Sequence, residues 1–360
     1  MGLNLMQAHK KSSLHTIAPY VGKLRPDLVK NLIENYSNKD TTIFDPFCGS
    51  GTVPLESWIM GRKTIGIDLN FYAYLISQAK LFPYANFDVA KKQLELYKNI
   101  VNAKVESSDL STLPDWIKDF FHPTTLKEII AWTDVLIKNN DYFTLACLLG
   151  ILHHQRPGFL SYPSSHGAPY LRNNKYPKSE FPMMYEYRNV YDRLSKKIER
   201  TYKFIPELDF TINREVLHIN TLNASDISDN TTIITSPPYM KSLTYARDNR
   251  MRLWFLGYSD WEGLDHEISI GKDAFSKLMD GCFDKWSNMQ KKESYCIVVV
   301  GDILFDRLKK KSIPDMICEV ASKHLYTTVD ILDYPIDQNR KVVKIESKIK
   351  TEKICIFRRS

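Results

Sequence analysis

Two acidic residues and two glycines near the N-terminus have the types and spacing of a nucleoside-binding turn. An apolar run ends in Asp45, a turn with Gly49 and Gly51 follows, and after a helical stretch a β-branched run ends in Asp68. Glycines let the backbone approach a ligand, and an acid ending the second strand is placed to accept both hydroxyls of a ribose. The pattern predicts the βαβ unit that opens a nucleotide-binding α/β sheet, although a simple turn between strand and helix has the same local signature.

The string DPFCGSGT (45–52) resembles motif I of the amino-directed DNA methyltransferases, which bind S-adenosylmethionine. The third glycine of the dinucleotide fingerprint is missing. The resemblance implies a Rossmann-like methyltransferase sheet in which the glycine turn lines the methionine half of the cofactor and Asp68 its ribose. Together with the preceding segment, it implies a cofactor site made of Tyr20, Lys23, Asp45, Pro46, Phe47, Cys48, Gly49, Gly51, Thr52, Asp68, Leu69 and Asn70.

The segment HTIAPYVGK (15–23) resembles motif X of the same family, which closes over the methionine end of the cofactor. Tyr20 and Lys23 would then face the cofactor, the alternative being a turn and a solvated charge. After Asp68, an apolar-faced helix is expected with Asn70 at its start. The resemblance places the first residues of that helix over the adenine ring, and the aromatic pair Phe71–Tyr72 either does so or belongs to the core.

A second chemical string is TTIITSPPY (231–239), a β-branched strand followed by two prolines. Two prolines fix φ and remove two N–H donors, so the carbonyls around Ser236 and Pro237 are expected to point outward without internal partners. Such carbonyls can accept hydrogen bonds from an exocyclic amino group, and Tyr239 offers a flat face to a base taken out of the helix. On its own, the string also fits an ordinary Pro-Pro turn.

TSPPY resembles motif IV of the amino-methyltransferases, and SPPY is the form most associated with N4 of cytosine. The resemblance implies a catalytic loop of Ser236, Pro237, Pro238 and Tyr239 that supports direct in-line methyl transfer after base flipping, without a metal or a covalent intermediate. N6 of adenine remains an alternative target. C5 of cytosine is disfavoured, because those enzymes carry a Pro-Cys dipeptide and none occurs here.

Composition sets broad limits. The 360 residues carry 49 Lys and Arg against 42 Asp and Glu, a mild basic excess that suits a polyanionic partner without proving one. No apolar run has the ~20 residues of a membrane span, and the N-terminus lacks a signal-peptide core, so a cytoplasmic protein is expected. The six cysteines are scattered and form no CxxC, and His153, His154 and His166 lack further ligands at metal spacing. We therefore predict neither a disulfide scaffold nor a metal site.

The stretch between the two strings is long and mostly helical over 86–155, and it continues into a Pro-, Tyr- and Arg-rich loop region over 155–190. Aromatic residues interleaved with basic ones suit contacts to phosphates and exposed bases, although a loop packed by its own aromatics is equally consistent. The segment after SPPY also carries three arginines, Arg247, Arg250 and Arg252, which either contact phosphates or pair with acids. The predicted DNA-binding residues are Arg156, Tyr162, Arg172, Lys175, Tyr245, Arg247 and Arg250.

The order X, I, long gap, IV favours a catalytic core made of residues 1–80 and 209–360, with a target-recognition insertion over 81–208. The strand 294–302, the late loop 333–341 and the closing strand near the C-terminus resemble the same family. The usual Gly-Asp pair before motif IV is absent, leaving Asn220 or Asp226 for the adenine contact. The resemblance implies S-adenosylmethionine as cofactor and double-stranded DNA as partner, and it leaves a cognate restriction endonuclease open. A tRNA guanine-N2 methyltransferase and a degenerate DNA-binding subunit are the alternatives.

Overall fold

The computed structural model describes residues 11–165, 167–224, 230–238, 245–268, 271–306, 311–335 and 351–360. Its centre is a seven-stranded sheet with the order β3-β2-β1-β4-β5-β9-β8, in which β9 is antiparallel to both of its neighbours and the other pairs are parallel. The strands of this sheet are β1 (Thr42–Asp45), β2 (Lys63–Ile67), β3 (Arg214–Leu217), β4 (Thr231–Thr235), β5 (Tyr295–Gly301), β8 (Tyr326–Pro335) and β9 (Thr351–Arg359). A two-stranded ribbon joins β6 (Leu304–Asp306) and β7 (Lys311–Ser312).

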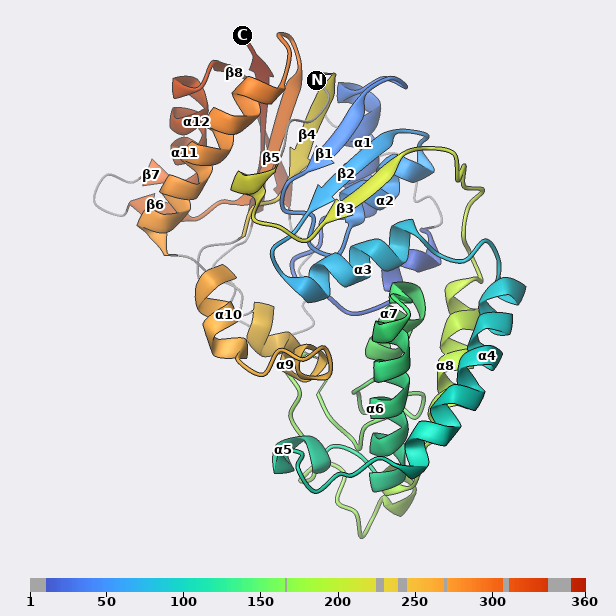
Figure 1. Ribbon diagram of the computed structural model, residues 1–360. Coiled ribbons are helices and arrows are strands. Elements are labelled where there is room, and N and C mark those ends of the chain that lie inside the picture. Colours follow the sequence, from blue (N-terminus) through green and yellow to red (C-terminus); the bar gives the residue numbers. More distant parts are fainter. Residues whose placement is uncertain are drawn as a thin grey trace.

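Helices cover both faces of the sheet (Figure 1). On one face, α1 (Pro26–Tyr36) and α2 (Thr52–Ile59) share a buried cluster with alternate residues of the central strands, including Ile43 and Ile234. On the other face, α11 (Lys272–Met289) and α12 (Ile313–Lys323) pack on the intervening residues, including Phe44 and Ile233. Strands that are buried on both faces have continuous apolar runs, which is why TIFD and TTIIT show no polar alternation. This is the predicted Rossmann-like methyltransferase fold.

A helical part lies at one end of the sheet and is made of α4, α6, α7 and α8, with the short α5 and η2 (Figure 1). It packs on α3 (Phe71–Leu81) mainly through α7, and its buried residues form one continuous cluster with α3 and with η1 (Ser13–Thr16). The bounds are α4 Phe87–Glu106, α5 Asp115–Lys118, α6 Pro123–Lys138, α7 Tyr142–Gly150, η2 Pro182–Tyr185 and α8 Val190–Thr201.

The remaining elements lie beside the carboxyl ends of the central strands (Figure 1). They are η3 (Thr221–Asn223), α9 (Tyr245–Phe255) and α10 (Trp261–Ile268). The structure corrects one sequence expectation in part: of the predicted late loop 333–341, Asp333–Pro335 form the end of β8, and 336–341 lie outside the described residues. The antiparallel pairing of β8 with β9 continues to Pro335, opposite Thr351, which accounts for the extended conformation. None of the helices among the described residues is long and apolar enough to cross a lipid bilayer.

Candidate cofactor and catalytic site

The carboxyl ends of β1, β2 and β4 meet at one edge of the sheet and open onto a single cavity of about 240 Å³. This edge is where ligands bind in open α/β sheets. The cavity joins the two strings that the sequence singled out. Its lining residues are Tyr20, Gly22, Pro46, Phe47, Gly49, Asp68, Leu69, Asn220, Thr221, Ser236, Pro238, Tyr245, Glu267, Ala274 and Leu278.

The glycine turn after β1 is held by backbone hydrogen bonds. Cys48 N–H donates to the Ile67 carbonyl at 2.8 Å, and Gly51 N–H donates to the Cys48 carbonyl at 2.8 Å. Both glycines have positive φ, +51° at Gly49 and +69° at Gly51, a region that other residues rarely adopt. Gly49 lines the cavity as predicted.

Gly51 packs closely against a neighbouring helix. A Cβ at this position would lie 2.7 Å from Ser77 Oγ and 3.0 Å from Ser77 Cα, and Gly51 is not among the residues lining the cavity. The glycine therefore allows α2 to start directly against α3. A side chain at this position would therefore collide with the protein's own helix, and the predicted place of Gly51 beside the cofactor stays a prediction.

Asp68 is the polar centre of the cavity. Its Oδ2 accepts the Gly49 N–H and its Oδ1 accepts the Asn70 N–H, both at 2.8 Å, so the carboxylate fixes the turn after β1 and the start of α3 together. Each oxygen retains a lone pair for a further donor. Asn70 is the predicted helix cap, since its side chain accepts the Tyr72 N–H at 3.0 Å. It is buried and does not line the cavity.

Burial raises the pKa of Asp68 to about 6, against its ordinary value of 3.8. We expect the affinity for a ligand whose hydroxyls donate to this carboxylate to fall as the pH drops through 6, because protonation removes the acceptor charge. Isothermal titration of S-adenosylmethionine between pH 5 and 8 measures this. An affinity that stays constant across this range contradicts the assignment of Asp68 to the cofactor ribose.

Asp45 connects the two strings directly. Its Oδ1 accepts the Thr235 hydroxyl at 2.7 Å and the Phe47 N–H at 3.2 Å, so the first glycine-turn acid is tied to the last residue of β4, next to Ser236. Burial raises the pKa of Asp45 to about 7. A second, smaller hollow adjoins the main cavity and shares several walls with it. The predicted cofactor residues Lys23, Asp45, Cys48 and Thr52 line this hollow instead.

The proline string reaches the cavity through Ser236 and Pro238, while Pro237 is buried between them. Tyr239 lies outside the described residues. The predicted catalytic loop is therefore brought to the same space as the glycine turn and Asp68. The remaining predicted cofactor residues Tyr20, Pro46, Phe47 and Leu69 also line that space.

The aromatic residues are distributed differently from expectation. Tyr245, predicted as a DNA contact, is buried in the cavity wall, where its ring stacks on that of Tyr20 at 6.1 Å between centroids and 28° between planes. Tyr72 is fully buried and donates its hydroxyl to the Pro19 carbonyl at 2.9 Å, so it belongs to the core. Phe71 packs on Tyr74 and Tyr258, and it does not line the cavity.

The three arginines after the proline string differ in burial and in their hydrogen-bond partners. Arg252 is buried, and its Nε donates to the Leu149 carbonyl at 3.1 Å, a backbone partner in place of the phosphate or acid that the sequence left open. Arg250 donates to the Pro169 carbonyl and lies over the Tyr170 ring, and so joins α9 to the 155–190 loop. Arg247 is exposed, with its Nε 4.0 Å from Asp248 Oδ1.

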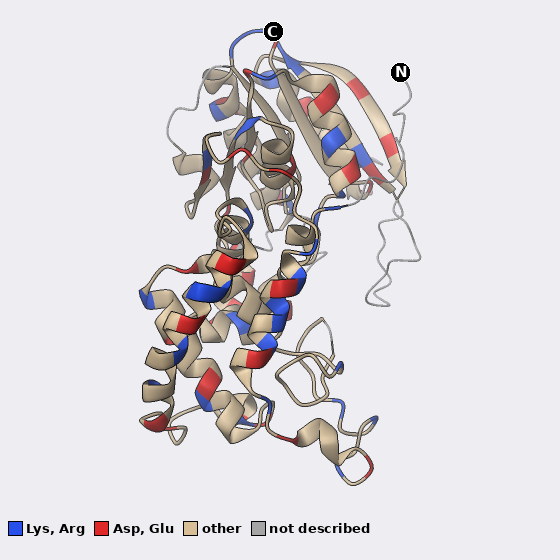
Figure 2. Cartoon of the chain, turned by 90° about the vertical axis from the view of Figure 1, so that its right-hand side faces the viewer, with Lys and Arg blue, Asp and Glu red and all other residues tan. Residues whose placement is uncertain are grey.

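The other predicted DNA contacts lie on the loop region of the helical part, away from the cavity lining. Arg156 and Lys175 are exposed, whereas Arg172 and Tyr162 are half-buried. Tyr162 packs against the Tyr185 ring at 5.0 Å. Lys and Arg are interspersed with Asp and Glu over the helices of this part (Figure 2). The loop is thus ordered by its own aromatics and still presents basic side chains.

The two described histidines of this region, His153 and His154, make polar contacts with nearby backbone groups. His153 Nδ1 lies 3.0 Å from the Ser165 carbonyl, and His154 Nδ1 accepts the Arg156 N–H at 3.1 Å. His166 and Asp226 lie outside the described residues. Within the described ranges there is no group of three or more His, Cys, Asp or Glu side chains that could hold a metal ion.

Sequence reasoning missed several cavity residues. Glu267 from α10 and the pair Ala274 and Leu278 from α11 lie in elements without a motif, so no local signal pointed to them. Asn220, one of the two residues that the sequence offers for the adenine contact, does line the cavity, next to Thr221. The Asn220 side chain caps η3 by accepting the Leu222 N–H at 3.0 Å.

Comparison with known proteins finds DNA methylases and type II methyltransferases among the sequences that this chain is similar to. A family model described as DNA methylase, and named for the N6 and N4 methyltransferases, matches residues 4–79. The chain is 32% identical over 143 residues to the type II methyltransferase M.MjaII of Methanocaldococcus jannaschii, which is 39% of this chain and 24% of that protein. It is 27% identical over 285 residues to M.BsoBI of Geobacillus stearothermophilus, covering 71% of this chain and 55% of that protein. M.MvaI of Kocuria varians is 21% identical over 387 aligned positions, covering 97% and 77%.

These matches support an amino-methyltransferase relationship. The chain spans about a quarter and about half of the length of the first two relatives. The relatives imply S-adenosylmethionine as the methyl donor. The cavity fits that molecule: Asp68 has free lone pairs, and Thr221 Oγ1, in the cavity wall, is buried with no hydrogen-bond partner in the described part of the chain. Such an orphaned hydroxyl is costly unless a ligand supplies the partner.

Proposed function

We propose that this protein is a site-specific DNA methyltransferase that transfers the methyl group of S-adenosylmethionine to an exocyclic amino group, N4 of cytosine in duplex DNA. The observation that carries the proposal is the Asp45–Thr235 hydrogen bond of 2.7 Å, which places the SPP string and the glycine turn on one cavity. A methyl donor and a methyl acceptor must share one space for direct transfer. We also propose that the protein acts in the cytoplasm.

In this proposal different residues contact the ribose, the adenine end and the methionine end of the cofactor. Asp68 accepts the ribose hydroxyls, and the Asn220–Thr221 pair takes the place of the missing acid at the adenine end, with the Thr221 hydroxyl as a hydrogen-bonding partner. Gly49 and Phe47, with Lys23 in the adjoining hollow, surround the methionine end. When bound, the cofactor supplies a methyl group on a sulfonium.

The proline string would receive the target base. Carbonyls around Ser236 and Pro237 accept hydrogen bonds from the exocyclic amino group, which directs the nitrogen lone pair toward the methyl group. A base inside a duplex is out of reach of this cavity, so the reaction requires that the base be flipped out. The nitrogen would gain the methyl group as the sulfur–methyl bond breaks, which leaves a neutral thioether, and it would release one proton to water. The only carboxylates among the cavity-lining residues of the described chain are Asp68 and Glu267.

The test is mass spectrometry of nucleosides from DNA treated with the purified protein and S-adenosylmethionine. N4-methylcytosine is the expected product. N6-methyladenine would keep the mechanism and change the base, because the SPP string alone does not distinguish the two. Methylation of tRNA but not of DNA would overturn the substrate class, and no methylation of either would favour a degenerate DNA-binding subunit.

We expect the double variant Ser236→Ala/Tyr239→Ala to keep cofactor binding and to lose methyl transfer, because both changes fall on the proposed base-receiving loop and leave the proposed ribose acceptor Asp68 unchanged. Cofactor titration and a tritiated-methyl transfer assay on the same preparation separate the two properties. Loss of both properties would mean that the loop is structural.

The basic residues of the 155–190 loop are proposed to contact DNA phosphates. The triple variant Arg156→Ala/Arg172→Ala/Lys175→Ala is expected to weaken DNA binding and to reduce the slope of log K against log salt concentration by about one per lost phosphate contact. Fluorescence anisotropy at several salt concentrations measures the slope. Lys91→Ala/Lys92→Ala, on the exposed face of α4, is the matched control and should leave the slope unchanged. Equal slopes for all three proteins would exclude the loop from the interface.

A further inference from the structure

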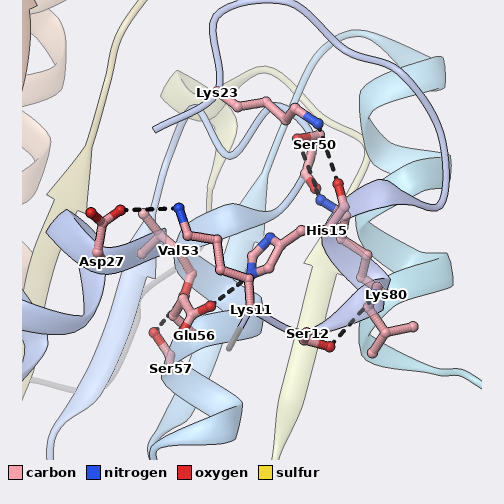
Figure 3. Close-up of polar contacts among 11 residues, drawn as sticks. Lys11, Ser12, His15, Lys23, Asp27, Ser50, Val53, Glu56, Ser57 and Lys80 are labelled. Atoms are coloured by element: carbon pink, nitrogen blue, oxygen red, sulfur yellow. Dashed lines mark hydrogen bonds and ion pairs between the residues drawn. The ribbon is translucent and has the colours of Figure 1, made fainter. Parts of the chain in front are cut away.

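Three ionisable side chains from three different segments are buried beneath the glycine turn (Figure 3). His15 of η1 is 7% exposed, Glu56 of α2 is 6% exposed, and Lys80 of α3 is fully buried. None of them lines the cavity, and the proposed reaction uses none of them. Buried ionisable groups are costly, so their presence calls for a function.

Lys80 holds the glycine turn from below. Its Nζ donates to the Ser50 carbonyl and lies 3.4 Å from Ser50 Oγ, and Ser50 is the residue between the two turn glycines. No carboxylate in the described ranges forms an ion pair with Lys80. An apolar side chain of the same length would avoid the cost of desolvating this ammonium group. We therefore explain the hydrogen bond from Lys80 to Ser50 by the conformation that it gives the glycine turn.

His15 and Glu56 hold the segment that covers the cavity. His15 Nε2 lies 2.6 Å from Glu56 Oε1, which joins η1 to α2. Lys23 Nζ donates to the His15 carbonyl at 3.3 Å. The hydroxyl of Tyr72, which lies on α3, donates to the Pro19 carbonyl. Tyr20 lies between these anchors, and its ring forms part of the cavity wall.

We propose that Lys80, Glu56 and His15 are positioning residues of the cofactor site. Lys80 sets the glycine turn so that the Gly49 N–H meets Asp68, and the Glu56–His15 pair holds Tyr20 over the bound cofactor. The inference rests on the proposed S-adenosylmethionine site and adds to it an anchoring layer that touches neither the cofactor nor the base.

The experiment is calorimetric titration of the full chain with S-adenosylmethionine, together with steady-state kinetics. Lys80→Met leaves the Ser50 carbonyl without its buried donor, and Glu56→Ala removes the partner of His15. Each is expected to raise Kd and KM for the cofactor about tenfold while kcat at saturating cofactor stays near wild type. Glu56→Gln keeps an acceptor oxygen for His15 and should bind nearly as tightly as wild type.

A general loss of stability must be separated from this effect. Thr125 is fully buried in the helical part and exchanges hydrogen bonds with the backbone of Arg188, far in sequence from the anchoring layer. Thr125→Val should lower the melting temperature and leave the cofactor Kd unchanged. The inference is overturned if Lys80→Met and Glu56→Ala bind like wild type, or if Thr125→Val weakens binding as much as they do. A wild-type chain that fails to bind S-adenosylmethionine would instead refute the proposed function on which the inference depends.

Discussion

Asp68→Ala is expected to abolish measurable binding of S-adenosylmethionine, with a Kd at least about 100-fold above wild type. The substitution removes the acceptor for two proposed ribose hydroxyls. It also leaves the Gly49 and Asn70 N–H groups, now bound at 2.8 Å each, without their carboxylate partner. Hydrogen bonds to a charged group contribute about 1.5–3 kcal/mol each, so losing two on the cofactor alone accounts for this change.

Asp68→Asn provides a finer version of the same experiment. One amide oxygen can replace one carboxylate oxygen, but the amide NH₂ then faces a second N–H donor, so we expect a substantial loss here as well. Asp302→Ala is the matched control, because Asp302 also follows a strand of the sheet, β5, but does not line the cavity. Titration calorimetry of all three variants gives the comparison. If Asp68→Ala and Asp302→Ala bind the cofactor equally, the cavity is not the cofactor site.

Gly51→Ala is expected to give the largest loss of stability among single substitutions in the turn. The new methyl group would lie 2.7 Å from Ser77 Oγ and 3.0 Å from Ser77 Cα, and a rotamer change at Ser77 cannot move the latter. Overpacking costs about 1–3 kcal/mol. A side chain at φ +69° adds about 1–2 kcal/mol. Denaturant titration should therefore show a decrease of the unfolding free energy by about 2–5 kcal/mol, the sum of these two terms.

Gly61→Ala separates the two contributions. Gly61 has a similar φ of +74°, but a Cβ there meets nothing within 4 Å. Only the conformational cost of about 1–2 kcal/mol should then remain. Similar losses at both positions would show that the close approach of α2 to α3 is not what requires Gly51.

The sequence by itself determined the elements that carry the site. The βαβ unit around Asp45 and Asp68, the Asn70 cap and the strand before Ser236 all follow from local rules, namely apolar runs, glycine turns and capping side chains. These rules work because each concerns residues near one another in the chain. That the strands before the glycine turn and before the proline string are parallel neighbours is a long-range pairing, which the structure shows.

Only the tertiary structure decided which side chains face the cavity. Tyr245 was expected on the DNA and lies against Tyr20, Arg252 was expected on either a phosphate or an acid and donates to the Leu149 carbonyl, and Glu267 was not anticipated at all. Each placement depends on how α9 and α10 pack against segments far away in sequence, and on which partner satisfies a buried polar group. Periodicity within one helix cannot supply that information. The roles of Gly51 and Lys80 were likewise set by packing, because the contacts that explain them join helix α3 to the turn before α2.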